Sequence, residues 1–590
     1  MSSFSNLRAK KDKKSYVNVP TVPRDQSSTS NSSPKAPLID DVQDENALRE
    51  LRIRDGLYST LPEWLEIRVS AEEGRGLWAK QVLKAAAVLH AQHKKTKLVF
   101  AGARNECQMA DWSIHKFECA ALQRWFQAAQ GVQLPPSDAV RCIARLLWNR
   151  EKKGRDSIWA KEVDSMQSHH IVVTKGEQMD TKLIEDQAQL AHSLVQYLGV
   201  AAPQELAEQF GINSAGELVD VISKFTTNTF TLSDPSLTPI GACVSPAAAL
   251  LNHSCNPNVV VVFPGADSSS KKGQPLLEVV ALRDISPGEQ LLTAYVDTTL
   301  PATLRQKALK ETYSFTCHCN LCDRKQDVDP RESLWCPKKC GGTCSLPDIE
   351  SEGTDLATLC TACKSPVPVS NLEEVLDAVR IGSEGLEKAE KLQYSEPDKA
   401  KRLTTNLIPL LTSAGLSHTT HPLLALTRLH QALLIDELSG AVMPSSQTGE
   451  EEAVVSPGVQ LTEKDRQEHL DECIRAGSKI VTGLSALLAP GHPMIGIATA
   501  ELGKLLAVDE IAVVDPQTNG GIIFPPTGPA RLKLAYDMLM RARASLRIGF
   551  GARNEGGRVG RQVREDLVRL EKEIEVWTSG VKNVLADRSR

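Results

Sequence analysis

The sequence predicts an α+β protein in which short strands, inserted helices and metal-binding cysteines precede an all-helical C-terminal region. Three observations lead to this class. Short apolar runs separated by Pro, Gly, Asn and Asp occupy 230–295. Eight of the fourteen cysteines fall between Cys317 and Cys363. Beyond about residue 371, apolar residues recur at helical spacing over long stretches.

The composition excludes several classes of protein. The 590 residues carry 68 basic and 73 acidic side chains, so the net charge is −5, and nucleic acid is not expected as a direct ligand. No apolar run approaches the roughly 20 residues that span a bilayer. The first 20 residues are polar and Lys-rich, unlike a secretory signal. We therefore expect no membrane segment and a reducing compartment, where clustered cysteines indicate metal or catalysis.

The N-terminal part begins with a polar tail, after which the sequence pattern is that of strands and helices. Residues 1–50 are rich in Ser, Pro, Lys and Asp, so we expect them to be disordered. Leu65–Val69 is predicted to be a strand, and Glu73–Leu77 a glycine-rich turn after it. About 135–226 is predicted to be helical.

Strands and then helices follow this insert. The expected strands are Phe230–Leu232, Val259–Phe263, Leu276–Leu282 and Leu291–Tyr295. Long amphipathic helices are expected throughout the C-terminal region, for example Ala400–Ser413, Pro422–Leu438, Lys464–Leu488 and Pro529–Leu546. Polar loops are expected at Met443–Val459 and Asp515–Gly528.

Three short strings carry chemistry. The first, Leu251–Asn258, places Asn252, His253 and Cys255 before a strand, and the second, Gly288–Tyr295, runs from a tight turn into a strand ending on tyrosine. Each alone is ordinary turn or hairpin sequence. The third contains three closely spaced thiols: Cys317, Cys319 and Cys322. These three need a fourth ligand to complete a tetrahedral zinc site, and Cys255 is the natural candidate.

A second cysteine set has the spacing of a structural zinc ribbon. Its two pairs, separated by about 20 residues, are Cys336, Cys340, Cys360 and Cys363. Cys344 is an alternative to Cys340, and free cysteines in a loop are the alternative to zinc. The remaining Cys142, Cys243 and Cys473 stand in apolar surroundings, which predicts buried thiols without a ligand role.

The three strings in this order resemble the SET-domain protein lysine methyltransferases. That family carries an N-H-S-C segment, a G-E-x-L…Y segment and a C-x-C-x2-C motif, and its G-x-G-L segment is matched by Gly74-Arg75-Gly76-Leu77. The resemblance implies S-adenosylmethionine as cofactor and a small-sheet, pseudoknotted fold. It implies binding of that cofactor by Gly74, Arg75, Gly76, Asn228, Asn252, His253 and Phe315. It makes Tyr295 the catalytic tyrosine and Phe230, with Tyr295, part of the lysine channel.

A finer resemblance is to the SET-and-MYND (SMYD) subfamily, in which a zinc finger interrupts the SET domain. Within 79–119, the string Glu106–Cys119 is similar to the second half of that finger and supplies Cys107, His115 and Cys119. No cysteine precedes Cys107. Three ligands cannot fill two tetrahedral zinc sites, so we expect a degenerate or truncated finger.

The resemblance also implies a domain plan and a function. A split SET domain would span 62–300, a post-SET zinc-binding region 301–368, and a TPR-like helical domain 371–590. The implied function is methylation of lysine in histone or non-histone proteins by a monomer in nucleus or cytoplasm, with protein partners on the helical domain. The alternative is a catalytically inactive scaffold that binds partners through that domain.

Overall fold

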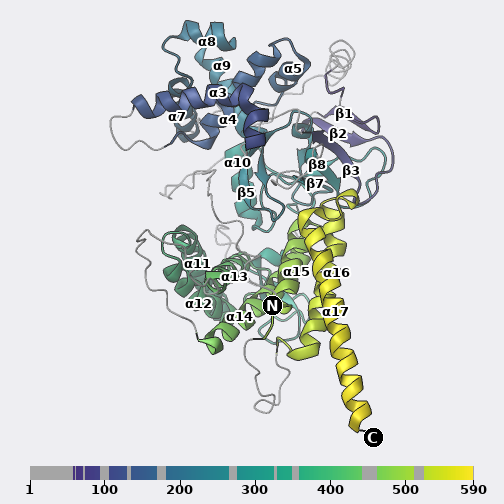
Figure 1. The fold of residues 1–590 in the computed structure, drawn as a ribbon. Helices are drawn as coiled ribbons and strands as arrows, with labels where there is room; N and C mark the ends of the chain where they lie inside the picture. Colours follow the sequence, from purple (N-terminus) through teal and green to yellow (C-terminus); the bar gives the residue numbers. More distant parts are fainter. Residues whose placement is uncertain are drawn as a thin grey trace. The chain divides into compact units, whose positions relative to one another are not determined.

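The computed structural model describes residues 57–59, 61–70, 73–93, 105–128, 135–168, 181–264, 275–323, 328–347, 358–440, 462–510 and 524–588. The tail expected at 1–50 and the loop expected at 443–459 lie outside these ranges. The described chain forms two compact units (Figure 1). One contains the residues up to 295 together with 306–317, and the other contains 296–305 and the residues from 318 onward.

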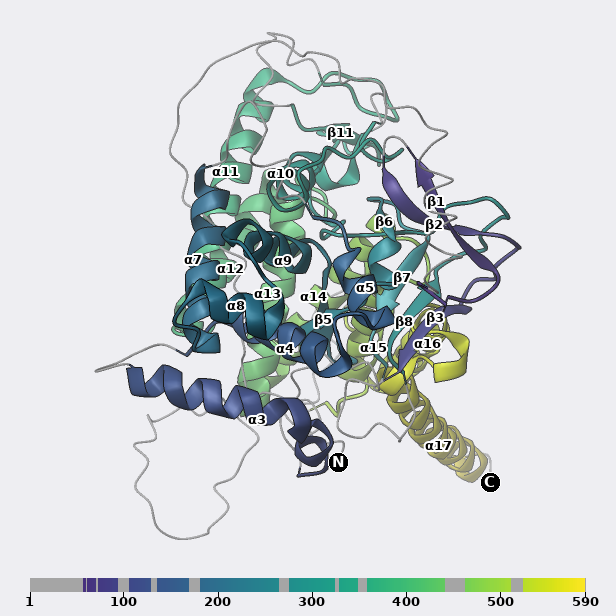
Figure 2. The same ribbon diagram turned by 90° about the horizontal axis from the view of Figure 1, so that it is seen from above.

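The first unit contains small sheets, which confirms the predicted α+β class. Strand β1 (Leu65–Ser70) pairs antiparallel with β2 (Gly74–Ala79), with Leu65 opposite Ala79. Strand β8 (Pro275–Ala281) lies between β3 (Val88–His93) and β7 (Val259–Val262), as Figure 2 shows. Two further pairs are β4 (Thr229–Ser233) with β5 (Pro239–Val244), and β6 (Asn252–His253) with β9 (Leu292–Thr293).

The prediction of a glycine-rich turn over Glu73–Leu77 is wrong for most of its length. Gly74 has φ +67° and stands opposite Ser70, where the hairpin begins its return. From there the chain is already strand β2, because Leu77 and Ala79 are buried and alternate with more exposed residues. The conformational freedom of glycine is thus used at Gly74, and the rest of the segment pairs with β1.

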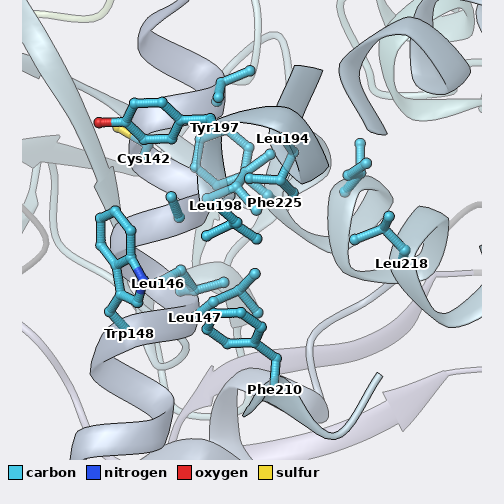
Figure 3. Close-up of a cluster of buried hydrophobic side chains, with 14 of the residues drawn as sticks. Cys142, Leu146, Leu147, Trp148, Leu194, Tyr197, Leu198, Phe210, Leu218 and Phe225 are labelled. Carbon is cyan, nitrogen blue, oxygen red and sulfur yellow. The ribbon is translucent and has the colours of Figure 1, made fainter. Parts of the chain in front are cut away.

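A helical insert lies between the strands of this unit. Its helices are α3 (Asn105–Ala128), α4 (Asp138–Lys153), α5 (Ile158–Asp164), α7 (Thr181–Leu198), α8 (Pro203–Phe210) and α9 (Ala215–Thr227). Helix α4 begins at a capping Ser137, whose hydroxyl accepts from the Val140 amide, and it is buried along most of its length. Figure 3 shows side chains of α4, α7, α8 and α9 converging on one core, with Cys142 among them.

The second unit is mainly helical. It contains α11 (Val369–Leu392), α12 (Pro397–Ser413), α13 (His421–Gly440), α14 (Glu463–Leu487), α15 (Pro493–Leu506), α16 (Gly528–Gly549) and α17 (Gly557–Arg588). Each helix packs on the next in chain order, and Figure 1 shows α16 beside α17. A short hairpin, β10 (Ser333–Trp335) with β11 (Thr343–Ser345), precedes them. Over the described part of the chain, no helix has the length and apolarity needed to cross a membrane.

Candidate active site and metal centres

A short parallel strand pair brings together two segments that are 40 residues apart in sequence. Asn252 stands opposite Leu292, and His253 stands opposite Thr293. The pairing continues beyond the strands, since the Ser254 amide donates to the Thr293 carbonyl at 2.9 Å. This register places the residues after Thr293 beside the Asn-His segment.

Tyr295 is held by hydrogen bonds at both ends and by aromatic rings around it. Its hydroxyl donates to the Leu251 carbonyl at 2.6 Å, and its backbone amide donates to Nδ1 of His253 at 2.9 Å. Its ring centroid lies 4.8 Å from that of Tyr313, 5.3 Å from that of His253 and 6.4 Å from that of Phe315. The tyrosine is therefore fixed in an aromatic enclosure.

Both tyrosines of this enclosure remain protonated at neutral pH. Burial of the phenol raises the pKa of Tyr295 well above its usual value of 10, and the nearby ionisable groups of Tyr313 and Glu73 raise it further. Burial also raises the pKa of Tyr313. The Tyr295 hydroxyl donates its proton to the Leu251 carbonyl and can still accept a hydrogen bond from a ligand, but both tyrosines are poor candidates for a general base.

His253 links the tyrosine segment to a cysteine. Because Nδ1 accepts the Tyr295 amide, the proton of the neutral ring lies on Nε2. Nε2 is 3.3 Å from Sγ of Cys255, so it can donate to that sulfur. The ring orientation is thus set from both sides.

Two buried amide donors in this unit have no partner among the described residues. They are Nδ2 of Asn252 and Nε2 of Gln290. The second lies against Gly76, where an added Cβ would be 2.6 Å from the Trp78 ring and 2.7 Å from Nε2 of Gln290. Unpaired buried donors cost about 1–3 kcal/mol each. Such donors fit a polar ligand such as the predicted cofactor, while the space at Gly76 itself is filled by the Trp78 ring and the Gln290 amide.

The other residues of the glycine segment are placed differently. Gly74 has open space around it, and nothing lies within 4 Å of an added Cβ. The Arg75 guanidinium turns to the helical insert and donates to the Ser165 carbonyl. Arg75 therefore anchors the hairpin, and its predicted cofactor role stays a prediction.

Asn228 and Phe230 lie at the end of α9 and on β4. The amide of Asn228 donates to the carbonyls of Gln167 at 2.8 Å and Lys224 at 2.7 Å, which occupies its donors. Phe230 stands opposite Cys243 and packs on the core of the small sheets. Their predicted roles at the cofactor and in the lysine channel likewise stay predictions.

Four sulfur atoms of the first predicted zinc set converge. All lie within 4.8 Å of one another, and they belong to Cys255, Cys317, Cys319 and Cys322. The side chain of Gln306 holds the backbone at Cys317. Its Nε2 donates to the Cys317 carbonyl at 2.6 Å, and its Oε1 accepts from the Cys317 amide at 2.8 Å. Four thiols in this arrangement suit tetrahedral Zn²⁺.

The second predicted set also converges. The sulfur atoms of Cys336, Cys340, Cys360 and Cys363 lie within 4.8 Å of one another. Cys344 is outside this group: it is fully buried on β11 within a hydrophobic cluster. Among the described residues these two groups are the metal-competent clusters of three or more ligands.

The segment that resembles half a finger forms a continuous helix, α3. His115 and Cys119 lie one turn apart, with Nε2 3.1 Å from Sγ, while the Cys107 side chain is outside the described residues. Between them Glu118 is buried and pairs with Arg145 at 2.7 Å. Within the described residues an ion pair, and no third ligand, fixes this segment to α4.

Sequence reasoning did not select three residues of this region: Tyr313, Asn258 and Gln290. Tyr313 could have been found, since it stands two residues before Phe315 in the same aromatic run. Asn258 closes the Asn-His string, but its structural role depends on partners more than 30 residues away. Gln290 carries no signal in the sequence, because its place against Gly76 arises only in the folded chain.

The chain is similar to known proteins over the segment that contains the Asn252–His253 strand and Tyr295. The SET domain family model matches residues 74–296. The chain is 32% identical to the N-lysine methyltransferase SMYD2 of Gallus gallus over 222 residues, 38% of this chain and 45% of that protein. It is 33% identical to the Homo sapiens SMYD2 over 225 residues, 37% and 45% of the two chains. The matched segment thus spans less than half of these relatives.

Proposed function

We propose that this chain, whose SET domain is that of a SMYD-like protein, is an S-adenosylmethionine-dependent protein-lysine N-methyltransferase. The observation that carries the proposal is the fixed Tyr295 beside the Asn252–His253 strand. The names of the matched relatives support the class of reaction. The lysine would belong to a histone or non-histone protein, and the compartment would be nucleus or cytoplasm.

The residues fit the cofactor through donors and space. Asn252 offers a buried donor that no other described residue pairs, which suits the carboxylate or adenine of S-adenosylmethionine. Gly76 allows the Gln290 amide to lie against the β2 backbone, which would place that donor at the ligand, and Phe315 would supply an aromatic face for the adenine. When bound, the cofactor supplies an electrophilic methyl group on a sulfonium.

The protein would chiefly desolvate and orient the lysine. An amine with a pKa near 10.4 in water must lose its proton before it can attack. The predicted apolar channel, with Phe230, Tyr295 and Tyr313 in its wall, would disfavour the ammonium form and so favour the neutral amine. The neutral Tyr295 hydroxyl orients that amine for an in-line displacement, and no covalent enzyme intermediate is needed.

Zinc on Cys255, Cys317, Cys319 and Cys322 would serve structure. It would tie the cysteine triplet to Cys255, and through the Nε2 contact to His253. This arrangement keeps the Asn-His segment in place beside Tyr295.

The test is Tyr295→Phe in the full chain. Methyl transfer from labelled cofactor to protein should fall by about 100-fold or more, because the orienting hydroxyl is lost. Affinity for S-adenosylhomocysteine should change by less than about threefold. The rate should rise with pH in both proteins, since the raised pKa of Tyr295 leaves the lysine as the group that deprotonates. Cofactor binding without transfer to any lysine in a broad proteome extract would contradict the proposal.

One observation favours the alternative of an inactive scaffold. The finger-like segment brings together only His115 and Cys119 among its described side chains, and an eroded module can accompany an eroded enzyme. A calorimetric titration with S-adenosylhomocysteine separates the two functions. Absence of binding would favour a scaffold that recruits partners through the helices of 371–590.

A further inference from the structure

The geometry points to a second, purely structural zinc in the helical unit, which we propose is bound by Cys336, Cys340, Cys360 and Cys363. The Sγ atoms of Cys336 and Cys363 are 3.7 Å apart, and those of Cys340 and Cys360 are 3.4 Å apart. A disulfide needs about 2.05 Å, so these are four separate thiols gathered at tetrahedral-ligand distances. The site takes no part in the proposed methyl transfer.

The backbone around each pair is shaped to hold negatively charged sulfur. Amide N–H groups of Lys338, Gly342, Ala362, Cys363 and Ser365 donate to the four sulfurs. Each pair also contains or adjoins a non-glycine residue in the left-handed region, Lys339 at φ +53° and Lys364 at φ +56°. Such conformations cost of order 1–3 kcal/mol and persist where the surroundings demand them. A metal ion bound by both turns would stabilise these two backbone conformations.

The two turns also approach each other closely. An added Cβ at Gly342 would lie 2.6 Å from Sγ of Cys360, so only glycine fits between the pairs. The Lys338 ammonium donates to the Ser365 hydroxyl at 2.9 Å and joins the turns from outside. Lys338, Lys339 and Lys364 place positive charge next to the ligands, which favours a zinc–tetrathiolate centre with its net charge of −2.

Exposure argues against a set of ordinary buried thiols. Cys340 and Cys363 are exposed, whereas Cys344 is fully buried in the hydrophobic cluster beneath them. Cys344 contacts Cys360 from this cluster without being one of the four converging sulfurs, and apolar packing does not account for the convergence of two solvent-facing cysteines on Cys336 and Cys360. A metal ion accounts for it.

The zinc would fasten three segments that are distant in sequence. The hairpin β10–β11 bonds to the second pair through the Thr361 amide and the Thr343 carbonyl at 2.9 Å. The same hairpin is joined to the loop between α12 and α13, because the Trp335 amide donates to the Gly415 carbonyl at 2.8 Å. Zinc binding would thus contribute directly to the stability of the hairpin and the two cysteine turns that precede α11.

Metal content of the full-length protein tests this site. After reconstitution with zinc and removal of excess, Cys360→Ser should hold one zinc fewer per chain than the unsubstituted protein, and Cys344→Ala, the matched control, should hold the same number. Both should retain affinity for S-adenosylhomocysteine, so failure of this site is separable from failure of the proposed enzyme. Equal zinc content in Cys360→Ser and the parent would overturn the proposal.

Should Cys360→Ser fail to fold, thiol labelling of the parent protein gives the answer. Cys340 and Cys363, although exposed, should resist iodoacetamide in the zinc-reconstituted protein and react once a strong chelator is added. The buried Cys473 should stay unlabelled while the protein is folded. Immediate labelling of Cys340 and Cys363 without chelator would mean that no metal is bound there.

Discussion

Asn252 and Asn258 carry the same side chain in opposite hydrogen-bonding states. Asn258 is buried and satisfied: its amide donates to Oε1 of Glu289 at 3.0 Å and to the Gln290 carbonyl at 2.8 Å, and it accepts from the Leu292 amide. Nδ2 of Asn252 is shielded from solvent and has no hydrogen-bond partner within the described ranges. Asn258 therefore serves the fold, and Asn252 is available to a ligand.

Alanine at each position should separate these two roles. Asn258→Ala should lower the free energy of unfolding by about 2–4 kcal/mol, because it leaves several buried groups unpaired. Asn252→Ala should change it by less than about 1 kcal/mol and weaken S-adenosylhomocysteine binding by roughly 10- to 100-fold. Urea unfolding and calorimetric titration measure the two effects. A stability loss at position 252 with unchanged affinity would contradict this assignment.

At the scale of elements, helices α15 and α16 approach each other through glycine. An added Cβ at Gly503 would lie 2.7 Å from Cδ2 and 3.2 Å from the backbone nitrogen of Leu539. At Gly496, about two helical turns earlier, an added Cβ would lie 2.8 Å from the Leu546 side chain. The leucine side chains can shift, but the backbone nitrogen cannot without moving α16. The close crossing therefore depends on these two positions.

Replacing Gly503 with alanine sets two effects on stability against each other, the packing of α15 on α16 and the helix propensity of the residue. Gly503→Ala should destabilise the protein by about 1–3 kcal/mol through overpacking, even though alanine favours helix by about 1 kcal/mol over glycine. Gly580→Ala on the exposed part of α17, where nothing lies within 4 Å, is the matched control and should stabilise slightly. Thermal unfolding of both variants decides. Equal stabilisation would show that α15 and α16 tolerate a wider separation.

The same packing explains which elements could be predicted from sequence. The expected helix Lys464–Leu488 is observed as Glu463–Leu487, because its apolar period is clear. Helix α15 lies in the region predicted to be helical, but its bounds were not predicted, since its glycines weaken the local signal and its position is set by packing on α16. The strand expected over Leu291–Tyr295 is reduced to two residues, because the Tyr295 amide bonds to a histidine ring rather than to a strand.

The candidate site shows the same division between local and long-range information. Cysteine spacing predicted both thiol groups that the structure brings together, since metal ligands leave a record in sequence. The open donor of Gln290 left none, and the aromatic run that contains Tyr313 did not show that its ring contacts Tyr295. These depend on where the fold brings β2, β9 and the last turn of α10 (Ala302–Tyr313).

At the scale of the whole molecule, each unit has hydrophobic clusters of its own. One cluster gathers α4, α7 and α9 with their neighbours, and another lies among the small sheets of the same unit. Separate clusters lie around α11–α13 and around α14 and α15 in the other unit. All the proposed cofactor-binding residues fall in the first unit. Ligand binding should therefore act first on the stability of that unit.

Calorimetry of the full chain with S-adenosylhomocysteine tests this consequence. A ligand that binds only the folded state adds about 2.7 kcal/mol at 100 times its dissociation constant. We expect two unfolding transitions, because chains with separate cores depart from two-state behaviour, and we expect saturating ligand to raise the temperature of one. Hydrogen exchange should assign it: protection should rise at 74–79, 251–258 and 290–295 and stay unchanged in α11–α17. An equal shift of both transitions, with protection spread over the helices, would mean that the two units unfold as one and that cofactor binding stabilises the chain throughout.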